Sequence, residues 1–403
     1  MTAYSHASNF SARFLAVGLA GFSTFINLYS PQAVLPLLSS EFGAGPAEIA
    51  NIMTASTLAV AIIAPFTGTV SDVLGRKRVI ITSMAVLAVP TVMVALAPTL
   101  HALILWRFVQ GLVLPPIFAV TIAYIGDEWS SAEAAKAAGI YTSGASIGGF
   151  SGRFITGIIA DLAGWRTGFM VLAAMTLVGA IAVALLLPYE RRFVRSEGLL
   201  ASARQMLSHF RNPQLVATYA VGFGVLFNFI ATFTYVSFHL ARPPYNFTPS
   251  LLGLIFVVYL LGSALTPLTG FAVGRFGRRR YMIAAITLWV AGILLTLAWP
   301  VWAIIAGLAL CAACGMICQA VSTGYVTITA KAGRSSAVGL YVTSFYVGGS
   351  CGAALGGLAW TLGSWPLCVA MIAAMLAIMA AIVWFGWTPR VPPAPALSPI
   401  EPP

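Results

Sequence analysis

The chain has 403 residues, of which 60% are hydrophobic and only 8% are charged. Soluble domains carry about 25% charged residues, so the composition excludes a fold with a fully water-exposed surface. The net charge of +11 does not indicate nucleic-acid binding, because most of the 21 Lys and Arg residues fall in alternate loops between apolar stretches.

Twelve apolar stretches of about 20 residues, the length that spans a bilayer, follow one another along the chain. They are predicted at 14–38, 48–70, 79–97, 101–125, 137–160, 167–188, 214–240, 250–273, 281–299, 302–328, 336–360 and 366–387. The first stretch is too long for a typical signal-peptide core, so we expect an uncleaved helix. The loops rich in Lys and Arg are then expected inside, with both termini in the cytoplasm.

The longest and most charged connection divides the chain near its middle. We predict an N-terminal six-helix bundle at 1–188, a cytoplasmic linker at 189–213 and a C-terminal six-helix bundle at 214–387. The Pro-rich segment 388–403 is expected to be a disordered tail.

The sequence repeats across this linker. The segment that begins at Gly68 returns 202 residues later at Gly270, and the fifth span matches the eleventh at an offset of 200. The residues of the fifth span and its end that recur in the second copy are Gly139, Tyr141, Gly148, Gly149, Gly152, Gly157 and Trp165. Duplicated six-helix units are a transporter architecture, with the substrate between the halves near the midplane.

The recurring glycines predict close helix contacts, since they remove side chains from one helix face. They are Gly139, Gly148, Gly152 and Gly157 in the fifth span, with Gly348 and Gly352 among their counterparts. We interpret them as the seam between the two halves. The alternative is ordinary packing within one half.

Two segments carry a family resemblance. Gly68-x3-Asp72-x2-Gly75-Arg76-Lys77 resembles the signature of the major facilitator superfamily for the loop between helices 2 and 3, although Val73 stands where a basic residue is usual. Leu103-x3-Arg107-x2-Gln110-Gly111 is similar to the fourth-helix motif of its drug/proton antiporters.

The fifth span adds a third motif. Gly139-x8-Gly148-x3-Gly152-x3-Thr156-Gly157 resembles the antiporter motif of that helix, with Arg153 in place of its proline. The chain thus resembles the bacterial acriflavine-resistance-like and arabinose-efflux-like permeases. This resemblance implies an all-α membrane protein whose twelve transmembrane helices form two pseudo-symmetric six-helix bundles.

At the inner loop, Asp72 is expected to accept hydrogen bonds from the start of another helix, near Ser335 and Ser336. The resemblance implies that Arg76 pairs with Asp127 or Glu128, in a charge lock that favours an outward-facing state. The alternative is that the basic residues of this loop only anchor the topology.

Arg107 and Arg153 lie inside predicted spans, where a central arginine costs roughly 2.5–3.5 kcal/mol on insertion scales. They either line a cavity and attract anionic or polar substrate groups, or are satisfied by helix-end carbonyls, polar neighbours or Asp161. Further residues predicted to line a substrate site are Asn27, Gln110, Asn228, Tyr235, Gln319 and Tyr346.

No acidic residue lies deep in a span, which favours neutral or anionic cargo over cationic drugs. The five cysteines occupy apolar spans without nearby histidines or acids, so we predict neither a metal site nor a disulfide. An enzyme would need clustered acids, histidines or nucleophiles within the spans, and the sequence has none.

We therefore predict a monomeric secondary transporter of the bacterial inner membrane that uses alternating access and no cofactor. Its partners are the lipid bilayer and a small-molecule substrate, and no nucleic acid. The expected reaction is efflux of small organic molecules, drug-like or sugar-like, by antiport against the proton gradient. The alternatives are an importer or exchanger of organic anions centred on Arg107 and Arg153, and a transport-dead membrane sensor.

Overall fold

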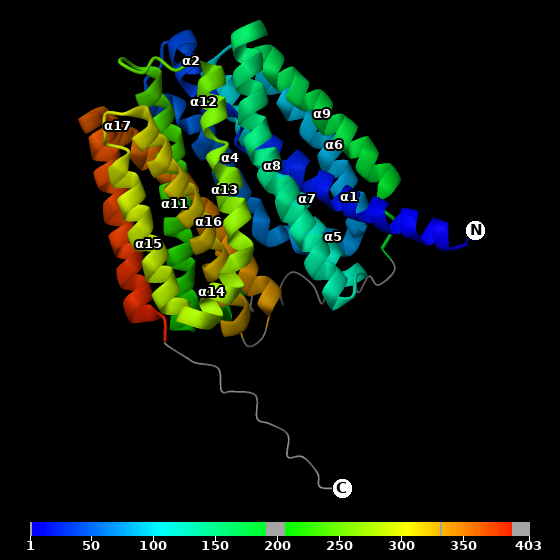
Figure 1. Ribbon diagram of the computed structural model, residues 1–403. Helices are drawn as coiled ribbons and strands as arrows, with labels where there is room; N and C mark the ends of the chain where they lie inside the picture. Colours follow the sequence, from blue (N-terminus) through cyan, green and yellow to red (C-terminus); the bar gives the residue numbers. More distant parts are fainter. Residues whose placement is uncertain (1, 191–205, 331–332, 389–403) are drawn as a thin grey trace.

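The computed structural model describes residues 2–190, 206–330 and 333–388, and this part of the chain is helical without strands (Figure 1). The side chains at 2–10, 69, 70, 72, 131, 132 and 335 lie outside that description. Most of the predicted linker and nearly all of the predicted tail fall outside it too.

The N-terminal half contains helices connected by short turns. They are α1 (Thr2–Leu28), η1 (Ser30–Ala33), α2 (Leu35–Phe42), α3 (Pro46–Ile49), α4 (Asn51–Ile63), η2 (Ala64–Phe66), α5 (Thr67–Leu74), α6 (Arg76–Ala95), α7 (Leu100–Glu128), α8 (Ser131–Ala163) and α9 (Trp165–Leu186).

The C-terminal half repeats the order of the spans, although its first span is the single helix α11 (Pro213–Ala241). After α11 it contains α12 (Pro249–Ile255), α13 (Val258–Leu265), η3 (Thr266–Leu268), α14 (Thr269–Phe276), α15 (Arg278–Leu295), α16 (Val301–Thr329) and α17 (Arg334–Gly386).

These helices make twelve crossings. Nine helical segments of the described chain are long and apolar enough to span a membrane. We count α8 and α15 as two further spans, although α8 is rich in glycine and α15 begins with three arginines. The twelfth crossing is the second part of α17, because its backbone leaves helical geometry at Gly363 and Ser364. The all-helical architecture of two six-helix bundles is confirmed.

The two halves repeat even their irregularities. Gly75 joins α5 to α6 with φ +90°, and Gly277 joins α14 to α15 with φ +80°. A backbone with φ in this region suits glycine, which has no Cβ to clash. The 3₁₀ turns η2 and η3 interrupt the second and eighth spans at equivalent places. The sequence repeat therefore reflects a repeated backbone.

The first span is not the continuous helix predicted at 14–38. α1 ends at Leu28, and η1 turns the chain before α2 begins. Pro31 has no N–H to donate to the carbonyl of Asn27, and the Gln32 N–H bonds Tyr29 O (3.2 Å) rather than Leu28 O. The break therefore leaves the carbonyl oxygens of Asn27 and Leu28 free of their usual backbone donors, and the Ser30 hydroxyl donates to Asn27 O (3.0 Å).

The seam interpretation of the glycines is wrong for Gly148 and Gly152. A Cβ at either position would collide with the backbone of α1, at Phe22 and Ile26 respectively, which belongs to the same half. It is equally wrong for Gly348 and Gly352 in α17. Their neighbours are the equivalent backbone positions of α11, in the C-terminal half; these are Phe223 and Phe227. Gly139 has open space around it.

Gly157 does lie between the halves. A Cβ there would collide with the carbonyl of Pro249 at the start of α12, and one at Gly253 would approach Arg153 O to 2.7 Å. On the other side of the seam, a Cβ at Gly357 would lie 2.8 Å from Ala47 Cα in α3. Among the described glycines, Gly157, Gly253 and Gly357 thus bring the halves together.

The N-terminal half, blue to green in Figure 1, lies beside the C-terminal half, green to red. We call the end of the molecule with Arg76 and Arg278 the basic end, and the opposite end, with Gly164 and Gly363, the distal end. In Figure 1, α5 and α14 lie at the basic end, and α2 and α12 lie at the distal end.

Candidate functional site

Arg107 lies on α7 and is completely buried. Its Nη1 donates to Asn27 O (3.0 Å) and its Nη2 to Leu28 O (2.5 Å), the two carbonyls that the break after α1 leaves free. It also donates to Gln110 Oε1 (2.6 Å) and to the Ser56 hydroxyl (3.1 Å). Hydrogen bonds to a charged group contribute about 1.5–3 kcal/mol each, so Arg107 satisfies the broken helix.

A chain of hydrogen bonds continues from Gln110 across the N-terminal half. Its Nε2 donates to Thr91 Oγ1 (2.7 Å), which donates to Asn27 Oδ1 (3.0 Å). Asn27 Nδ2 in turn donates to Thr176 Oγ1 (2.8 Å). With Ser56, these bonds connect α1, α4, α6, α7 and α9. This Arg107 network lies inside one half, where it stiffens the bundle.

Arg153 is also buried, at 1% exposure, but it lies against the other half. Its Nε donates to Gln32 Oε1 (2.8 Å) and its Nη1 to Gly149 O (2.5 Å). Its Nη2 is 3.5 Å from the hydroxyl of Tyr259 on α13. Gln32 Nε2 also donates across the seam, to Thr234 Oγ1 on α11 (3.2 Å).

Three aromatic rings enclose the Arg153 guanidinium. Its central carbon is 4.8 Å from the ring centroid of Tyr29, 4.4 Å from that of Phe256 and 4.7 Å from that of Tyr259. A desolvated cation–π pair contributes about 2 kcal/mol. We call Arg153 and these three rings the arginine cage.

Asp161, offered as a partner for the arginines, makes a different contact. Its Oδ2 accepts from the backbone N–H of Ser250 (2.9 Å), at the N-terminal end of α12 in the other half. The seam is crossed again at mid-depth, where the Thr57 and Ser350 hydroxyls are 2.8 Å apart. The described hydrogen bonds between the halves thus run from the distal end to the middle of the spans.

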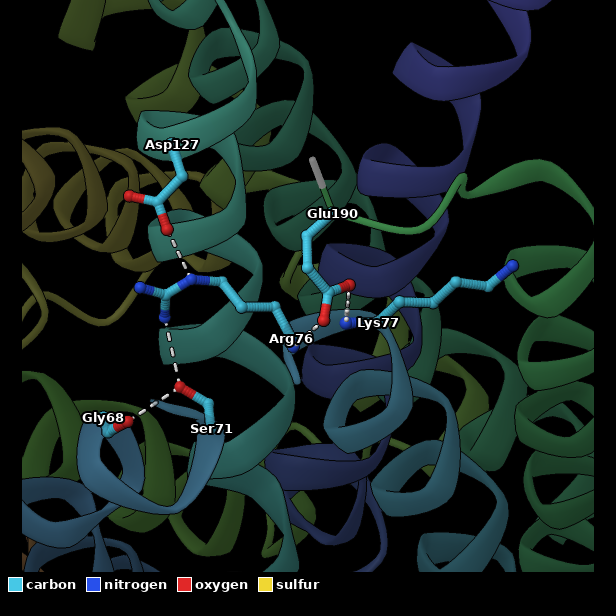
Figure 2. Close-up of polar contacts among 6 residues, drawn as sticks. All are labelled: Gly68, Ser71, Arg76, Lys77, Asp127 and Glu190. Atoms are coloured by element: carbon cyan, nitrogen blue, oxygen red, sulfur yellow. Dashed lines mark hydrogen bonds and ion pairs between the residues drawn. The ribbon is translucent and has the colours of Figure 1, made fainter. Parts of the chain in front are cut away.

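The residues of the loop signature form a cluster at the basic end (Figure 2). Arg76 Nε donates to Asp127 Oδ2 (2.5 Å), and Arg76 Nη1 donates to the Ser71 hydroxyl (3.1 Å). Ser71 in turn donates to Gly68 O (2.8 Å). These bonds tie α5, α6 and α7 of one half together. The side chain of Asp72 and the expected contact at Ser335 fall outside the described residues.

Glu190 completes this cluster, as Figure 2 shows. Its carboxylate accepts from the backbone N–H groups of Arg76 (3.0 Å) and Lys77 (3.3 Å), at the start of α6. A negative charge stabilises a helix N-terminus. The carboxylate fills the space where a Cβ of Gly75 would stand, so only glycine permits both the turn and the cap.

The structure does not gather the predicted substrate residues at one place. Arg107, Asn27 and Gln110 belong to the Arg107 network. Tyr346 is buried and stacks on Phe118 of the other half, with ring centroids 6.1 Å apart.

The remaining three candidates lie in the C-terminal half. Asn228 is buried with its Nδ2 3.3 Å from Met379 Sδ, and Tyr235 donates to Ala353 O (2.5 Å). Both therefore pack between helices of their own half. Gln319 is exposed on α16, in the basic-end part of the span.

For Arg107, the structure matches the alternative of helix-end carbonyls and polar neighbours, which are the carbonyls of Asn27 and Leu28 and the side chain of Gln110. Sequence reasoning missed the groups of the other half that surround Arg153. Phe256 and Tyr259 gave no signal for this, because only the packing of the two halves brings them to Arg153.

A duplicated bundle of membrane-spanning helices, joined along a seam with buried polar groups, defines a multi-pass membrane transporter. The family model described as Major Facilitator Superfamily matches residues 17–243 and 227–402. The chain belongs to the Major Facilitator Superfamily, whose members are transporters and not enzymes.

Individual comparisons agree with this assignment. The chain is 33% identical over 368 residues to the inner membrane transport protein YnfM of Escherichia coli K12, covering 90% of this chain and 88% of that protein. It is 26% identical to the multidrug resistance protein Stp of Mycobacterium tuberculosis, over 70% of this chain and 62% of Stp. A crystal structure of a bacterial homologue of the human lysosomal transporter Spinster has a TM-score of 0.74 and 15% identity, covering 95% and 99% of the two chains.

Proposed function

We propose that this chain is a proton-driven exporter of small organic molecules that works by alternating access in the bacterial inner membrane. The basic end faces the cytoplasm, as the positive-inside rule favours. The likeness to Stp and to an inner membrane transport protein supports export across that membrane. The protein acts as a monomer.

The observation that carries this proposal is the difference between the inside of a half and the seam. Within the N-terminal half, the Arg107 network connects five helices by charged and polar hydrogen bonds. Across the seam, the described hydrogen bonds join single pairs of residues, such as Asp161 with Ser250 and Thr57 with Ser350. Stiff halves that are joined by such separate contacts suit rocking around a central site.

The proton-binding group is among the carboxylates outside the membrane core. Asp161 does not suit this role, because its protonation would have the wrong effect on the conformation. Its charged form accepts a hydrogen bond from the Ser250 N–H and so favours joined distal ends. Protonation from outside would then favour distal opening, whereas an antiporter must use the bound proton to return to the inward-open state. We propose Asp72 and Asp127, at the basic end, as the candidates for the proton-binding group.

Exchange or import of organic anions is a second candidate. It is favoured by the surroundings of Arg153, whose described partners are amide, carbonyl, hydroxyl and ring groups without a carboxylate. A cation without a protein counter-ion can accept an anionic group of the cargo when the halves separate.

Proteoliposomes with an imposed proton gradient and an internal pH dye test the two functions. Ethidium, uridine and benzoate serve as cationic, neutral and anionic probes, with Arg153→Ala and Arg107→Ala beside the parent. The proposal expects at least one probe to drive proton movement in the parent. Benzoate exchange without proton movement would support the second candidate, and no response to any probe would contradict both for these compounds.

A further inference from the structure

The arginine cage draws its members from both halves of the molecule. Arg153 and Tyr29 belong to the N-terminal half, whereas Phe256 and Tyr259 belong to the C-terminal half, at the interruption between α12 and α13. Three of the four side chains are buried in the seam, and Tyr29 is partly exposed. Arg153, Phe256 and Tyr259 are 1%, 1% and 4% exposed.

We propose that the arginine cage is the latch that holds the distal ends together during transport. The cation on one half is stabilised by rings on the other, so the contact is made only while the distal ends are joined. The hydrogen bond from Gln32 to Thr234 lies next to the cage and also crosses the seam, from η1 to α11.

The backbone geometry makes this contact obligatory in the joined state. Gly157 and Gly253 allow α8 and α12 to touch without intervening side chains, next to the cage. Any separation of α8 from α12 therefore withdraws Phe256 from Arg153. The latch and the seam cannot open independently.

The latch is also reversible for a physical reason. On separation Arg153 keeps Gln32 Oε1 and Gly149 O, which belong to its own half, and the ring of Tyr29. Water that enters from the distal end then solvates the side of the guanidinium that the C-terminal rings had covered. A carboxylate in place of these rings would give a stronger attraction that is harder to release.

Arg107 provides the contrast. It has the same charge and is also fully buried, but its described partners Asn27, Leu28, Gln110 and Ser56 all belong to the N-terminal half. Its bonds are unaffected when the halves move apart, so it has no latch role. It is the matched control for the experiment.

Distances between spin labels at both ends of the molecule test the latch. In a background without the native cysteines, one label pair replaces Leu162 and Leu362 at the distal end, both of which are about 80% exposed. A second pair replaces Val73 and Phe276 at the basic end, which are also exposed. Pulsed electron–electron double resonance measures the two label distances in the parent and in four variants. The variants are Arg153→Gln, the double ring variant Phe256→Leu with Tyr259→Leu, Arg153→Lys and Arg107→Lys.

We expect Arg153→Gln and the ring variant to lower the ratio of distal-closed to distal-open molecules about tenfold. The distal distance should lengthen while the basic-end distance shortens, which general loosening of the fold would not produce. Arg153→Lys should restore part of the closed population, and Arg107→Lys should leave both distances at their parent values.

The ring variant keeps the assay informative if Arg153→Gln does not fold, because it leaves the charge in place. Unchanged distances at both ends in the folded ring variant would overturn the latch. So would lengthening at both ends, since this outcome reports loss of packing rather than a shift between two states.

Discussion

Arg107 and Arg153 carry the same charge inside the membrane, but their partners differ in origin. Arg107 supplies donors to the carbonyls that Pro31 leaves free in the first span. Arg153 is covered by rings from the opposite half. The first arginine therefore contributes to the stability of one bundle, and the second to the balance between two conformations.

Truncation of Arg107 should destabilise the protein strongly. Arg107→Ala leaves the buried Leu28 carbonyl without its described donor, at about 1–3 kcal/mol for such an unsatisfied group, and removes one of the two donors to Asn27 O, which keeps the Ser30 hydroxyl. Ser56→Ala removes a single bond to the same guanidinium and should cost about 1 kcal/mol. Unfolding of purified protein in detergent, followed by circular dichroism, compares the two. Equal losses would mean that the broken helix does not depend on Arg107.

Gly75 and Gly277 occupy equivalent turns in the two halves, so substitutions at the two positions can be compared directly. Both have φ near +80° to +90°, but only Gly75 has a carboxylate, that of Glu190, where a Cβ would stand. Each substitution by alanine should cost about 1 kcal/mol or more from backbone strain. Gly75→Ala should cost more, because it also displaces the cap on α6.

The same unfolding assay measures this difference, with Glu190→Ala as the background that separates strain from clash. In that background the two alanine variants should become equally destabilising. A persistent excess for Gly75→Ala would show that Glu190 is not its source.

Among the helices, the glycines of α8 serve two purposes at different depths. Gly152 lets α8 pack on α1 of the same half, whereas Gly157 lets it touch α12 of the other half. Gly152→Ala should lower the free energy of unfolding by about 1–3 kcal/mol through overpacking. Gly157→Ala should instead shift the distal distance, with a smaller effect on unfolding. The distal label distance and the thermal unfolding of the two variants are measured in parallel. Identical behaviour of the two variants would contradict separate roles for Gly152 and Gly157.

The spans could be predicted from the sequence, because the length of an apolar stretch shows whether it can cross a bilayer. The duplication could be predicted too, because Gly75 recurs as Gly277 at a turn that requires glycine. The helix against which a glycine packs could not be predicted from the sequence. A small residue predicts a close neighbour, but the same spacing serves a neighbour in either half. Of the six glycines interpreted as the seam, four pack within their own half and Gly139 has open space around it. The rings around Arg153 were equally inaccessible, since they meet it only through the tertiary arrangement.

For the whole molecule, the proposed transport cycle requires two stiff bundles that separate first at one end and then at the other. The distal ends are joined in this structure by Asp161 and Ser250, by Gly157 against Pro249 and by the arginine cage. A covalent bond across this seam should stop the cycle without disturbing either bundle.

The most direct measurement is therefore transport by a protein cross-linked at the distal seam. Cysteines replace Asp161 and Ser250 and are joined with a short bifunctional thiol reagent, in proteoliposomes loaded with the cargo found in the probe panel. A control pair replaces Glu41 and Arg166, an ion pair within the N-terminal half. We expect cross-linking of the seam pair to abolish transport and reductive cleavage to restore it, while the control pair keeps its rate. Transport at the parent rate through the cross-linked seam would contradict alternating access by separation of the two halves.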